Sequence, residues 1–415
     1  MNSWLSVPPD SDFTIYNFPF GVYQMDQQKP RLASILGNHI IDLAAMNALG
    51  FFHDLHITEE VFENRYLNDF IALGKSVTNK VRQILIETFS NSDSGLAVNS
   101  EYRQLIIKSY DDVQMLMPVK VGNYTDFYSS IQHATNVGSM FRDPKNALLP
   151  NYRHIPIGYH GRASSITVSG TSFHRPKGQT KAADAELPVF GPTKQLDFEL
   201  EMAFITGKST QLGDSVSTTD AEDYIFGMVL FNDWSARDIQ TWEYVPLGPF
   251  LAKNFCSTIS PWVVTIEALN PFRVKGEEQV PAVLPYLQFS GNKNIDINLT
   301  VEIETASGRV KQISRSNYKY MYWNMNQQLA HHTVNGCNIE VGDMYASGTI
   351  SGNDETAYGS MLELTWRGSK PIQMPDGTER KFINDNDTVI MRGFAVNGDM
   401  RVGFGEAKAK VLPAI

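Results

Sequence analysis

The sequence has few cysteines, no long hydrophobic run and no concentration of positive charge. Only two of its 415 residues are cysteines, Cys256 and Cys337, which argues against a disulfide framework and is typical of a reducing cytosol. No uninterrupted apolar stretch is long enough to span a bilayer. The first residues, MNSWLSVPPDSDF, show neither the basic nor the apolar segment of a signal peptide. We therefore expect a cytoplasmic protein with no membrane partner.

The charge balance is acidic, with a formal net charge of −10 and no block of lysine or arginine. This argues against nucleic acid as a partner, because phosphate binding needs a concentrated basic surface. An anionic ligand could still bind through a local cluster of cationic residues or a metal ion. Several familiar catalytic motifs are also missing: the chain has no P-loop, no GxSxG, no HExxH and no CxxC.

The length of the chain predicts two domains. In the first, residues 1–117, two β-rich runs (16–24 and 31–43) come before a helical pattern over residues 66–89. Gly37-Asn38 predicts a hairpin turn within the second run, and the composition of residues 91–100 predicts a loop. In the second domain, residues 118–415, strands and loops rich in glycine and proline dominate, so the predicted fold is mostly β with some α.

The stretch LDFELEMAF (196–204) has apolar residues at every even position and Asp197, Glu199 and Glu201 between them. A strand would place the three carboxylates on one side, with neighbours about 6.6 Å apart. Each adjacent pair would repel by roughly 0.6 kcal/mol in water, and about four times more near a protein surface. Exposure, Arg or Lys partners, or a hard ion such as Ca²⁺ or Mg²⁺ could relieve this repulsion.

A second acidic segment begins with an apolar run at residues 225–231, which predicts a buried strand ending at Asn232-Asp233. The residues after it have helical character. Asp233, Arg237, Gln240 and Tyr244 are spaced i, i+4, i+7 and i+11, which predicts that they share one face of a helix. The alternative is an exposed helix face with an Asp–Arg pair.

The segment NYTDFYSSIQHATNVGSMFRD predicts a helix from Thr125 on which Asp126 and His133 share a face. Histidine is the usual general base near neutral pH, although a packed or surface histidine is the commoner case. The neighbours His331 and His332 do not face one point on a helix, so we interpret them as structural.

Glu363 is the only acid in GSMLELTW, which we interpret as a strand. It is either an exposed edge charge or a buried carboxylate with a partner, because burial without one is costly. Lys253, in the loop GPFLAKNFC, poses the same choice. Cys256 in that loop is interpreted as a small loop residue rather than a nucleophile, since a nucleophile would need an adjacent base.

Taken together, these segments resemble the fumarylacetoacetase (fumarylacetoacetate hydrolase) family. Seven stretches occur in the family's order: GNYTDFYSSIQHATNVGSMFRD, IPIGYHGRASS, LDFELEMAF, NDWSARDIQTWEYVPLGPFLAK, YMYWNMNQQLAHH, ASGTISG and GSMLELTW. The resemblance implies a small SH3-like N-terminal domain, a C-terminal mixed-sheet β-roll and a homodimer. It also implies metal-dependent hydrolysis of a carbon–carbon bond in a small diketo acid, 4-fumarylacetoacetate. The products are fumarate and acetoacetate, at the end of tyrosine and phenylalanine catabolism.

The resemblance also implies roles for individual residues. Ca²⁺ or Mg²⁺ at the catalytic site would be held by Asp126, Glu199, Glu201 and Asp233, with Asp197 left out. His133 matches the general base and Glu363 the acid that orients it, while Arg237, Gln240 and Lys253 surround the reacting oxygen. The matched substrate contacts are Tyr128, Arg142, Tyr159, Gln240, Tyr244 and Thr349. A second, structural Mg²⁺ would involve the loop at Lys253 and Ser257.

That loop departs from the family pattern, with Ala252, Cys256 and Ser257 where Gly, Gly and Thr are expected. Serine keeps a hydroxyl, whereas Cys256 replaces a residue that adopts positive φ freely. The sequence leaves two alternatives to the implied activity. One is a related enzyme of the superfamily that acts on acylpyruvates or other diketo acids. The other is a calcium-stabilised module without catalysis, which would explain the acids but not His133, Glu363 and Arg237 together.

Overall fold

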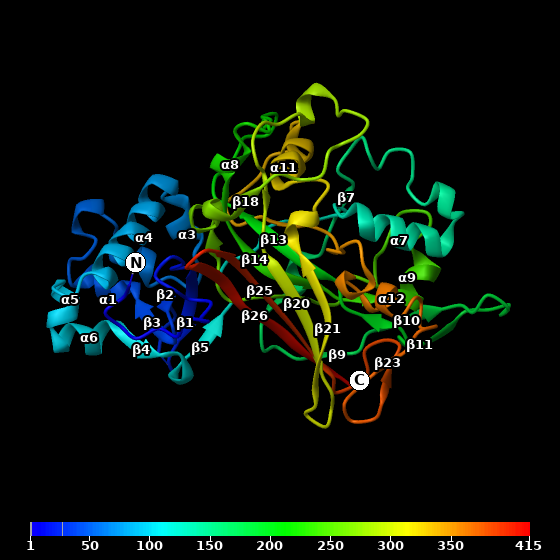
Figure 1. Cartoon of the computed structure of the whole chain (residues 1–415), viewed down its shortest axis with the longest axis horizontal. Helices are drawn as coiled ribbons and strands as arrows, with labels where there is room; N and C mark the ends of the chain where they lie inside the picture. Colours follow the sequence, from blue (N-terminus) through cyan, green and yellow to red (C-terminus); the bar gives the residue numbers. More distant parts are fainter. Residues whose placement is uncertain (1, 27) are drawn as a thin grey trace.

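The computed structural model describes residues 2–26 and 28–415. Figure 1 shows a smaller N-terminal part, coloured blue to cyan, beside a larger part built of sheets. The N-terminal part contains a five-stranded antiparallel sheet in the order β4-β3-β2-β1-β5. Its strands are β1 (Phe20–Gln24), β2 (Arg31–Leu36), β3 (His39–Asp42), β4 (Ile107–Ser109) and β5 (Gln114–Leu116). The predicted hairpin is confirmed, because Gly37 joins β2 to β3 with a φ of +62°.

The helices of this part follow the predicted pattern with two corrections. The helical pattern over residues 66–89 forms two helices rather than one, because Gly74, at φ +86°, separates them. The predicted loop at residues 91–100 contains a short helix, because Ser94 caps its first turn by accepting the N–H of Ala97 at 3.2 Å. The helices are α1 (Leu43–Ala48), α2 (Glu59–Phe62), α3 (Asn68–Ala72), α4 (Lys75–Ser90), α5 (Gly95–Val98) and α6 (Ser100–Ile106).

The larger part is organised around a sheet of eight strands in which β13 and β14 are central neighbours. The path runs β7-β6-β22-β13-β14-β16-β8, with β17 paired to β14. Parallel and antiparallel pairs both occur, since β6 and β22 are parallel while β13 and β14 are antiparallel. The strands are β6 (Tyr124–Phe127), β7 (Gly158–His160), β8 (Ile166–Val168), β13 (Leu200–Thr206), β14 (Ile225–Asp233), β16 (Ser257–Ile259), β17 (Val264–Thr265) and β22 (Met344–Ala346).

A second sheet, in the order β21-β20-β25-β26-β9, packs against the first. The core between them contains the apolar residues at even positions of the stretch 196–204, which confirms the predicted alternation there. These residues are Leu196, Phe198, Leu200, Met202 and Phe204, and they meet Leu299, Val301 and Phe404 of the second sheet. The strands of the second sheet are β9 (Phe173–His174), β20 (Asn298–Glu304), β21 (Val310–Asn317), β25 (Thr388–Asn397) and β26 (Met400–Leu412).

The opposite face of β13 and β14 shares a core with the N-terminal part. Ala203, Ile205 and Val229 belong to one buried cluster with Phe20 and Ile71. The two parts are also joined through main-chain hydrogen bonds between Phe20 and Val263. Such a shared core fixes the sheet that carries the acidic residues. The predicted division at residues 117 and 118 falls between β5 and β6, and it stays a prediction.

The remaining elements lie around the two sheets. Short strand pairs are β10 (Lys177–Thr180) with β11 (Val189–Pro192), β12 (Leu196–Asp197) with β15 (Ser235–Ala236), β18 (Arg273–Val274) with β19 (Asn294–Ile295), and β23 (Ile372–Gln373) with β24 (Glu379–Arg380). The helices are α7 (Ile131–Phe141), α8 (Ala221–Tyr224), α9 (Arg237–Glu243), α10 (Ile266–Leu269), α11 (Met325–Thr333) and α12 (Met361–Leu364).

The architecture agrees with the fold class predicted from the sequence. A small antiparallel N-terminal half-barrel accompanies a C-terminal domain of mixed sheets, and strands outnumber long helices. Across residues 2–26 and 28–415, no helix combines the length and the apolar character needed to cross a membrane.

Candidate metal centre and active site

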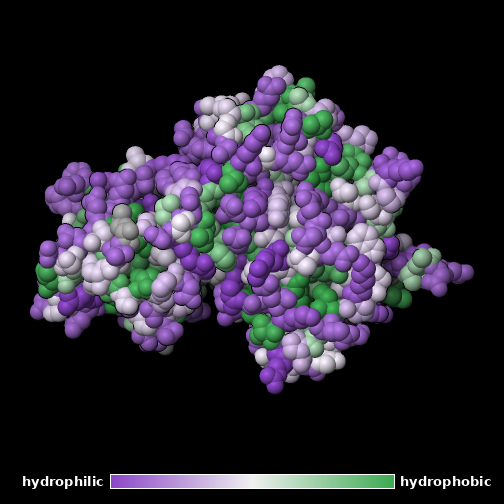
Figure 2. Space-filling model, viewed as in Figure 1, coloured by the Kyte–Doolittle hydropathy of each residue, from purple (hydrophilic) through white to green (hydrophobic). Residues whose placement is uncertain are grey.

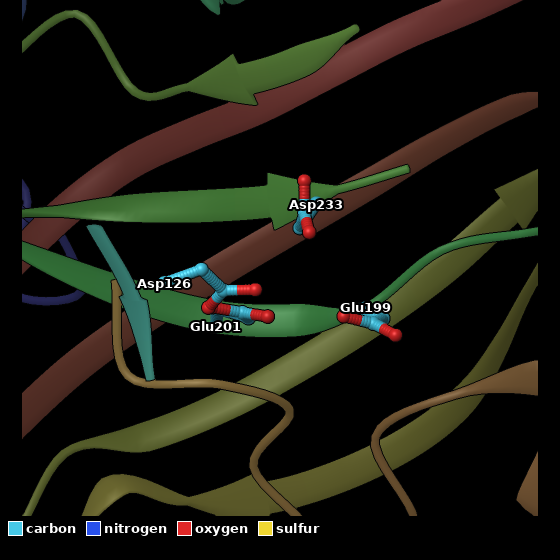
Figure 3. Close-up of side chains that lie close together, drawn as sticks. All are labelled: Asp126, Glu199, Glu201 and Asp233. Atoms are coloured by element: carbon cyan, nitrogen blue, oxygen red, sulfur yellow. The ribbon is translucent and has the colours of Figure 1, made fainter. Parts of the chain in front are cut away.

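Four buried carboxylates carried on or next to β6, β13 and β14 converge on one point (Figure 3). Asp126 lies on β6, Glu201 on β13, Asp233 at the end of β14, and Glu199 directly before β13. Each offers an oxygen that lies within 4.8 Å of the oxygens of the others. The strand register brings them together, because Leu200 pairs with Asn232 and β22 joins β13 to β6.

The predicted helical placement of two of these acids is wrong. Asp233 is the last residue of β14 and pairs with Ser257, while the helix α9 begins only at Arg237. Asp126 lies on a strand, and the helix with His133 starts after Ser130, whose Oγ accepts the N–H of His133 at 3.2 Å. The i, i+4 spacing is compatible with a helix, but the ladder of hydrogen bonds to neighbouring strands decides the conformation here.

Two cationic side chains hold one side of the acid cluster. Lys253 Nζ lies 2.6 Å from Glu199 Oε2 and 2.7 Å from Asp233 Oδ2. Arg237 Nη1 lies 2.8 Å from Glu199 Oε1, and Ser257 Oγ donates to Asp233 Oδ1 at 3.0 Å. Burial opposes the ionisation of Glu199, but Lys253 and Arg237 outweigh it and lower the pKa of Glu199. Of the three possibilities for LDFELEMAF, exposure is excluded and cationic partners are present.

The other side of the cluster lacks compensating charge. Among the described residues, Asp126 Oδ1 and Glu201 Oε1 are buried without a hydrogen-bond partner. Glu201 keeps one contact, because its Oε2 accepts the N–H of Gly348 at 2.9 Å. Burial, and then repulsion from the neighbouring carboxylates, raises the pKa of Asp126 and of Glu201 well above the usual range. Four carboxylates with two orphaned oxygens, and no sulfur or imidazole among them, fit a hard divalent ion.

His133 and Glu363 form a buried pair, with His133 Nδ1 2.7 Å from Glu363 Oε2. Glu363 lies on the short helix α12 rather than on the predicted strand. The sequence did carry the correct signal, because Ser360 and Glu363 match the S-x-x-E capping pattern. Ser360 Oγ accepts the N–H of Glu363 at 3.4 Å and donates to its Oε2 at 2.8 Å. Glu363 is 1% exposed, so of the two possibilities for this residue, an exposed edge charge or a buried carboxylate with a partner, the second is correct.

Additional donors surround Glu363 that the sequence did not single out. Asn136 Nδ2 donates to its Oε1 at 2.9 Å, and Ser351 Oγ lies 3.0 Å from both oxygens. Burial opposes ionisation, but His133 and these hydrogen bonds outweigh it and lower the pKa of Glu363. An ionised Glu363 can only accept, so His133 donates from Nδ1, and in a neutral imidazole held in this way the acceptor nitrogen is Nε2.

The helix α9 presents Arg237 and Gln240 together, since Arg237 Nη1 donates to Gln240 Oε1 at 3.4 Å. Arg237 is buried, and its Nη2 has no partner among residues 2–26 and 28–415. Tyr244 follows the end of α9 and its side chain is 52% exposed. The alternative of an exposed helix face with an Asp–Arg pair is therefore wrong for Arg237, which is buried.

The residues matched to substrate contacts fall into two groups. Tyr128 stacks edge-on against His133 with ring centroids 5.3 Å apart, and Tyr159 donates to Asp233 Oδ2 at 3.3 Å. Thr349 is buried and follows Gly348, which donates to Glu201. Arg142 is exposed and donates to the main-chain carbonyl of Ala147. The structure thus brings three of them to the acid cluster or to His133 and places Gln240 beside Arg237, whereas the Arg142 and Tyr244 side chains are exposed.

The unusual loop at residues 252–257 keeps an ordinary backbone. Neither Ala252 nor Cys256 belongs to the described non-glycine residues with positive φ. Both are buried, and burial raises the pKa of the Cys256 thiol to about 11, which argues against a thiolate nucleophile. The side chains of Lys253 and Ser257 already bind the acid cluster. A lysine ammonium has no lone pair, so a second Mg²⁺ here would need main-chain carbonyls.

The histidine pair on α11 serves packing, as predicted from adjacency. His331 Nδ1 lies 3.1 Å from Tyr286 OH, and the ring of His332 lies between Thr125 (3.2 Å) and Tyr345 (3.3 Å). The two imidazoles thus contact different partners.

Family models match almost the whole chain. Residues 123–412 match the model described as "Fumarylacetoacetate (FAA) hydrolase C-terminal", and residues 16–118 match "Fumarylacetoacetase N-terminal". The chain belongs to the fumarylacetoacetase family. It is similar to the fumarylacetoacetase of Dictyostelium discoideum, with 50% identity over 420 residues that cover 100% of this chain and 98% of the relative. The human fumarylacetoacetase is 49% identical over 415 residues, covering 100% and 99%.

A solved structure supports the fold alone. The structure titled fumarylacetoacetate hydrolase from psychrophilic Exiguobacterium antarcticum superposes with a TM-score of 0.53 at 17% identity, covering 95% of this chain and 99% of that chain. At this identity the likeness concerns the arrangement of the elements.

Proposed function

We propose that the chain is a fumarylacetoacetase, an enzyme that hydrolyses 4-fumarylacetoacetate to fumarate and acetoacetate in tyrosine and phenylalanine catabolism. The observation that carries this is the buried His133–Glu363 pair beside four converging carboxylates. It occurs in a chain that is 49–50% identical along its whole length to fumarylacetoacetases.

The hydrolysis begins with proton transfer to His133. Glu363 holds Nδ1, so Nε2 is the atom that takes a proton from a water molecule. The water then attacks the ketone carbon next to the fumaryl group. General-base help of this kind is worth about 10²–10⁴-fold in rate.

The charge that develops on the attacked oxygen needs donors. Arg237 and Lys253 supply fixed cationic donors, and Gln240 supplies an amide beside Arg237. Losing one donor of this kind commonly costs about 10²–10³-fold in kcat. His133 then returns its proton to the acetoacetate carbon as the C–C bond breaks, which completes the balance of atoms: water adds OH to the fumaryl carbon and H to the leaving group.

Asp126, Glu199, Glu201 and Asp233 would hold the divalent ion. When bound, Ca²⁺ or Mg²⁺ supplies positive charge that stabilises the oxygens of the departing carbanion. A second, structural Mg²⁺ would bind main-chain carbonyls of residues 253–257, because the side chains of Lys253 and Ser257 already contact Asp233.

A turnover assay on fumarylacetoacetate tests the proposal. We expect hydrolysis by the metal-loaded enzyme, loss of it after exhaustive chelation, and recovery on adding Ca²⁺ or Mg²⁺. Replacing His133→Ala should lower kcat by about 10²–10⁴-fold with little change in KM. His154→Ala, in the turn before β7, serves as the matched control. Wild-type turnover by His133→Ala would remove His133 from the base role, and activity independent of metal would contradict the ion's part.

The same assay separates the alternatives. Faster cleavage of acylpyruvates than of fumarylacetoacetate would assign the chain to a related activity of the superfamily. A calcium-dependent gain in stability without turnover of any diketo acid would favour the non-catalytic module. The buried His133–Glu363 pair disfavours that module, because binding an ion does not require a poised base.

We further propose a homodimer formed through one apolar surface. The hairpin β10–β11 projects from the body at the right of Figure 1, and α9 packs against β10, where Ile239 lies against Gly178. Exposed apolar side chains gather on the hairpin, on α9 and on the loop that follows α9, and we call them the arm surface: Leu187, Val189, Phe190, Trp242, Val245, Leu247, Phe250 and Leu251. An apolar surface of this kind marks an interaction site, and a second copy of the chain would cover it isologously. The cytoplasmic location stays a prediction.

A further inference from the structure

Asp197 is a fully buried acid that the proposed reaction leaves unused, with 0% of its surface exposed. Its Oδ2 accepts the Nε–H of Arg237 at 2.9 Å and the main-chain N–H of Leu362 at 3.0 Å. Its Oδ1 accepts the N–H of Met361 at 2.7 Å. Both oxygens are therefore occupied by donors, and the residue is not part of the four-carboxylate cluster.

These contacts join the two halves of the site. Arg237 is the first residue of α9, and β12, which carries Asp197, pairs with β15 immediately before it. Met361 and Leu362 begin α12, whose next residue, Glu363, binds His133. One carboxylate thus contacts the helix of the proposed oxyanion donor and the helix that orients the base.

The contacts also fix the plane of Arg237. Asp197 holds Nε, and Glu199 holds Nη1 at 2.8 Å. A guanidinium is a rigid planar fork, so anchoring two of its nitrogens fixes the direction of the third. That third nitrogen, Nη2, is the buried donor for which the described part of the chain offers no partner.

We propose that Asp197 is a positioning residue: anchored by the amides of α12, it holds Arg237 so that the Nη2 donor keeps its place relative to His133. This inference rests on the proposed function, because it assigns Arg237 to the transition state. Without Asp197 the guanidinium is held by Glu199 and Gln240 alone, and its donor loses the preorganisation on which such stabilisation depends.

Asp197→Asn is the first test, because asparagine has the same size but no charge and presents an NH₂ group to a donor. We expect kcat on fumarylacetoacetate to fall roughly 10- to 100-fold, less than the loss from deleting a donor outright, with KM within about threefold. Asp197→Glu keeps the charge but moves the carboxylate by one methylene, and it should give a smaller loss. It also replaces Asp197→Asn if that variant fails to fold.

Asp387→Asn is the matched control. Asp387 is likewise 0% exposed, binds Arg380 at 2.7 and 2.8 Å and accepts a main-chain N–H from Asn384 at 3.0 Å. None of these partners belongs to the proposed site. We expect a similar fall in Tm for both variants but an unchanged kcat per folded molecule for Asp387→Asn. Equal losses of kcat in the two would mean that Asp197 is merely structural.

A double-mutant cycle decides whether Asp197 acts through Arg237. In an Arg237→Gln background, adding Asp197→Asn should change kcat by less than about twofold, because the group that it positions is already gone. If the full loss persists in that background, Asp197 acts by another route and the proposal is overturned.

Hydrogen exchange separates this proposal from the function on which it rests. The amides of Met361 and Leu362 should exchange faster in Asp197→Asn than in the wild type and in Asp387→Asn. Unchanged exchange would refute the anchoring whatever the enzyme does. A wild-type chain that fails to hydrolyse fumarylacetoacetate would instead refute the proposed function.

Discussion

At the scale of single residues, the acid cluster is a balance between like charges and too few cations. Glu201 is poorly compensated, because one oxygen accepts from Gly348 and the other finds no partner among the described residues. Its pKa is raised, by burial first and then by Asp126 and the other carboxylates. Such a residue destabilises the folded chain when no cation is bound and stabilises it when a cation binds.

The effect of Glu201→Gln on stability, relative to the wild type, should therefore change sign when metal is added. In excess chelator we expect the variant to be at least as stable as the wild type, since a neutral amide removes repulsion. With Ca²⁺ or Mg²⁺ at a hundred times the dissociation constant, the wild type should gain about 2.7 kcal/mol and the variant clearly less. Urea unfolding with and without metal measures this, and Asp54→Asn, at a fully exposed side chain, is the control. Equal gains in Glu201→Gln and the wild type would contradict the metal site.

The burial of His332 predicts how the stability of the protein depends on pH. Burial, followed by repulsion from His160 and His331, lowers its pKa to about 4 in the folded chain, against roughly 6.5 for an unperturbed histidine. Between these values the unfolded chain binds more protons, so stability rises with pH, and His332 costs stability as the pH falls from 6.5 toward 4. Above pH 6.5 both states are neutral and the cost vanishes.

We expect His332→Gln to lose less stability than the wild type between pH 7.5 and pH 5, by an amount on the order of 1 kcal/mol. Denaturant unfolding in chelator at the two pH values measures the difference without contributions from bound metal. His53→Gln, at a side chain that is 80% exposed, is the matched control. If His332→Gln follows the wild type, the pKa of this histidine is the same in the folded and the unfolded chain.

At the scale of elements, the helix α7 ends in a turn that has no room for a side chain. A Cβ at Gly138 would lie 2.0 Å from the carbonyl oxygen of Ala147 and 2.8 Å from Arg142 Nη2. The turn between these residues includes the short 3₁₀ helix Pro144–Asn146. The close approach of this turn to the helix keeps Arg142 bound to Ala147, and α7 also carries His133.

Gly138→Ala should destabilise the protein, although alanine favours a helix over glycine by about 1 kcal/mol. Overpacking against a main-chain carbonyl costs about 1–3 kcal/mol and would displace the turn that carries Arg142. We therefore expect a lower Tm and a higher KM. Gly95→Ala in α5, where a Cβ meets nothing within 4 Å, is the matched control and should neither lower Tm nor raise KM. If Gly138→Ala is instead more stable than the wild type, the turn at Ala147 moves away from the added Cβ at little cost in free energy.

How far the sequence predicted these elements depended on the kind of signal. The alternation in 196–204 and the apolar run of β14 identified buried strands correctly, because burial on one or both faces leaves a direct pattern. The spacing of Asp233 and Arg237 wrongly predicted that both lie on one helix, because β14 continues through Asp233, which pairs with Ser257, and α9 begins only at Arg237. Glu363 was assigned to a strand although Ser360 three residues earlier indicated a capped helix.

At the scale of the whole molecule, the arm surface gathers eight exposed apolar side chains on one hairpin, α9 and the loop after it. Leu247 is 97% exposed and Phe190 is 73% exposed, and Figure 2 shows hydrophobic green at the projecting hairpin and beside it. Burying such side chains against another protein gains about 25 cal/mol per Å² of apolar surface. Tyr244 lies beside this surface, so association would also reduce the exposure of a proposed substrate contact.

Leu247→Glu combined with Phe190→Glu should convert the proposed dimer into a monomer, because two carboxylates per chain would be buried without partners. Analytical ultracentrifugation measures the mass. Leu212→Glu is the control: its side chain is 82% exposed, in a loop joined to residue 336 through Gly213. A monomeric wild type, or a double variant that remains dimeric, would contradict the arm surface as the interface.

The sequence by itself determined the chemical inventory and much of the local structure. The acids of LDFELEMAF, the histidine and the family's ordered segments were all readable without coordinates, since residue type and short-range pattern are local properties. The tertiary structure decided which partners the acids have. Glu199 faces Lys253 and Arg237, Asp197 binds the start of α12, and Glu363 reaches His133 across a separation of 230 residues. Strand register and the packing of two sheets set these pairings, and neither is expressed in the spacing of residues along one segment.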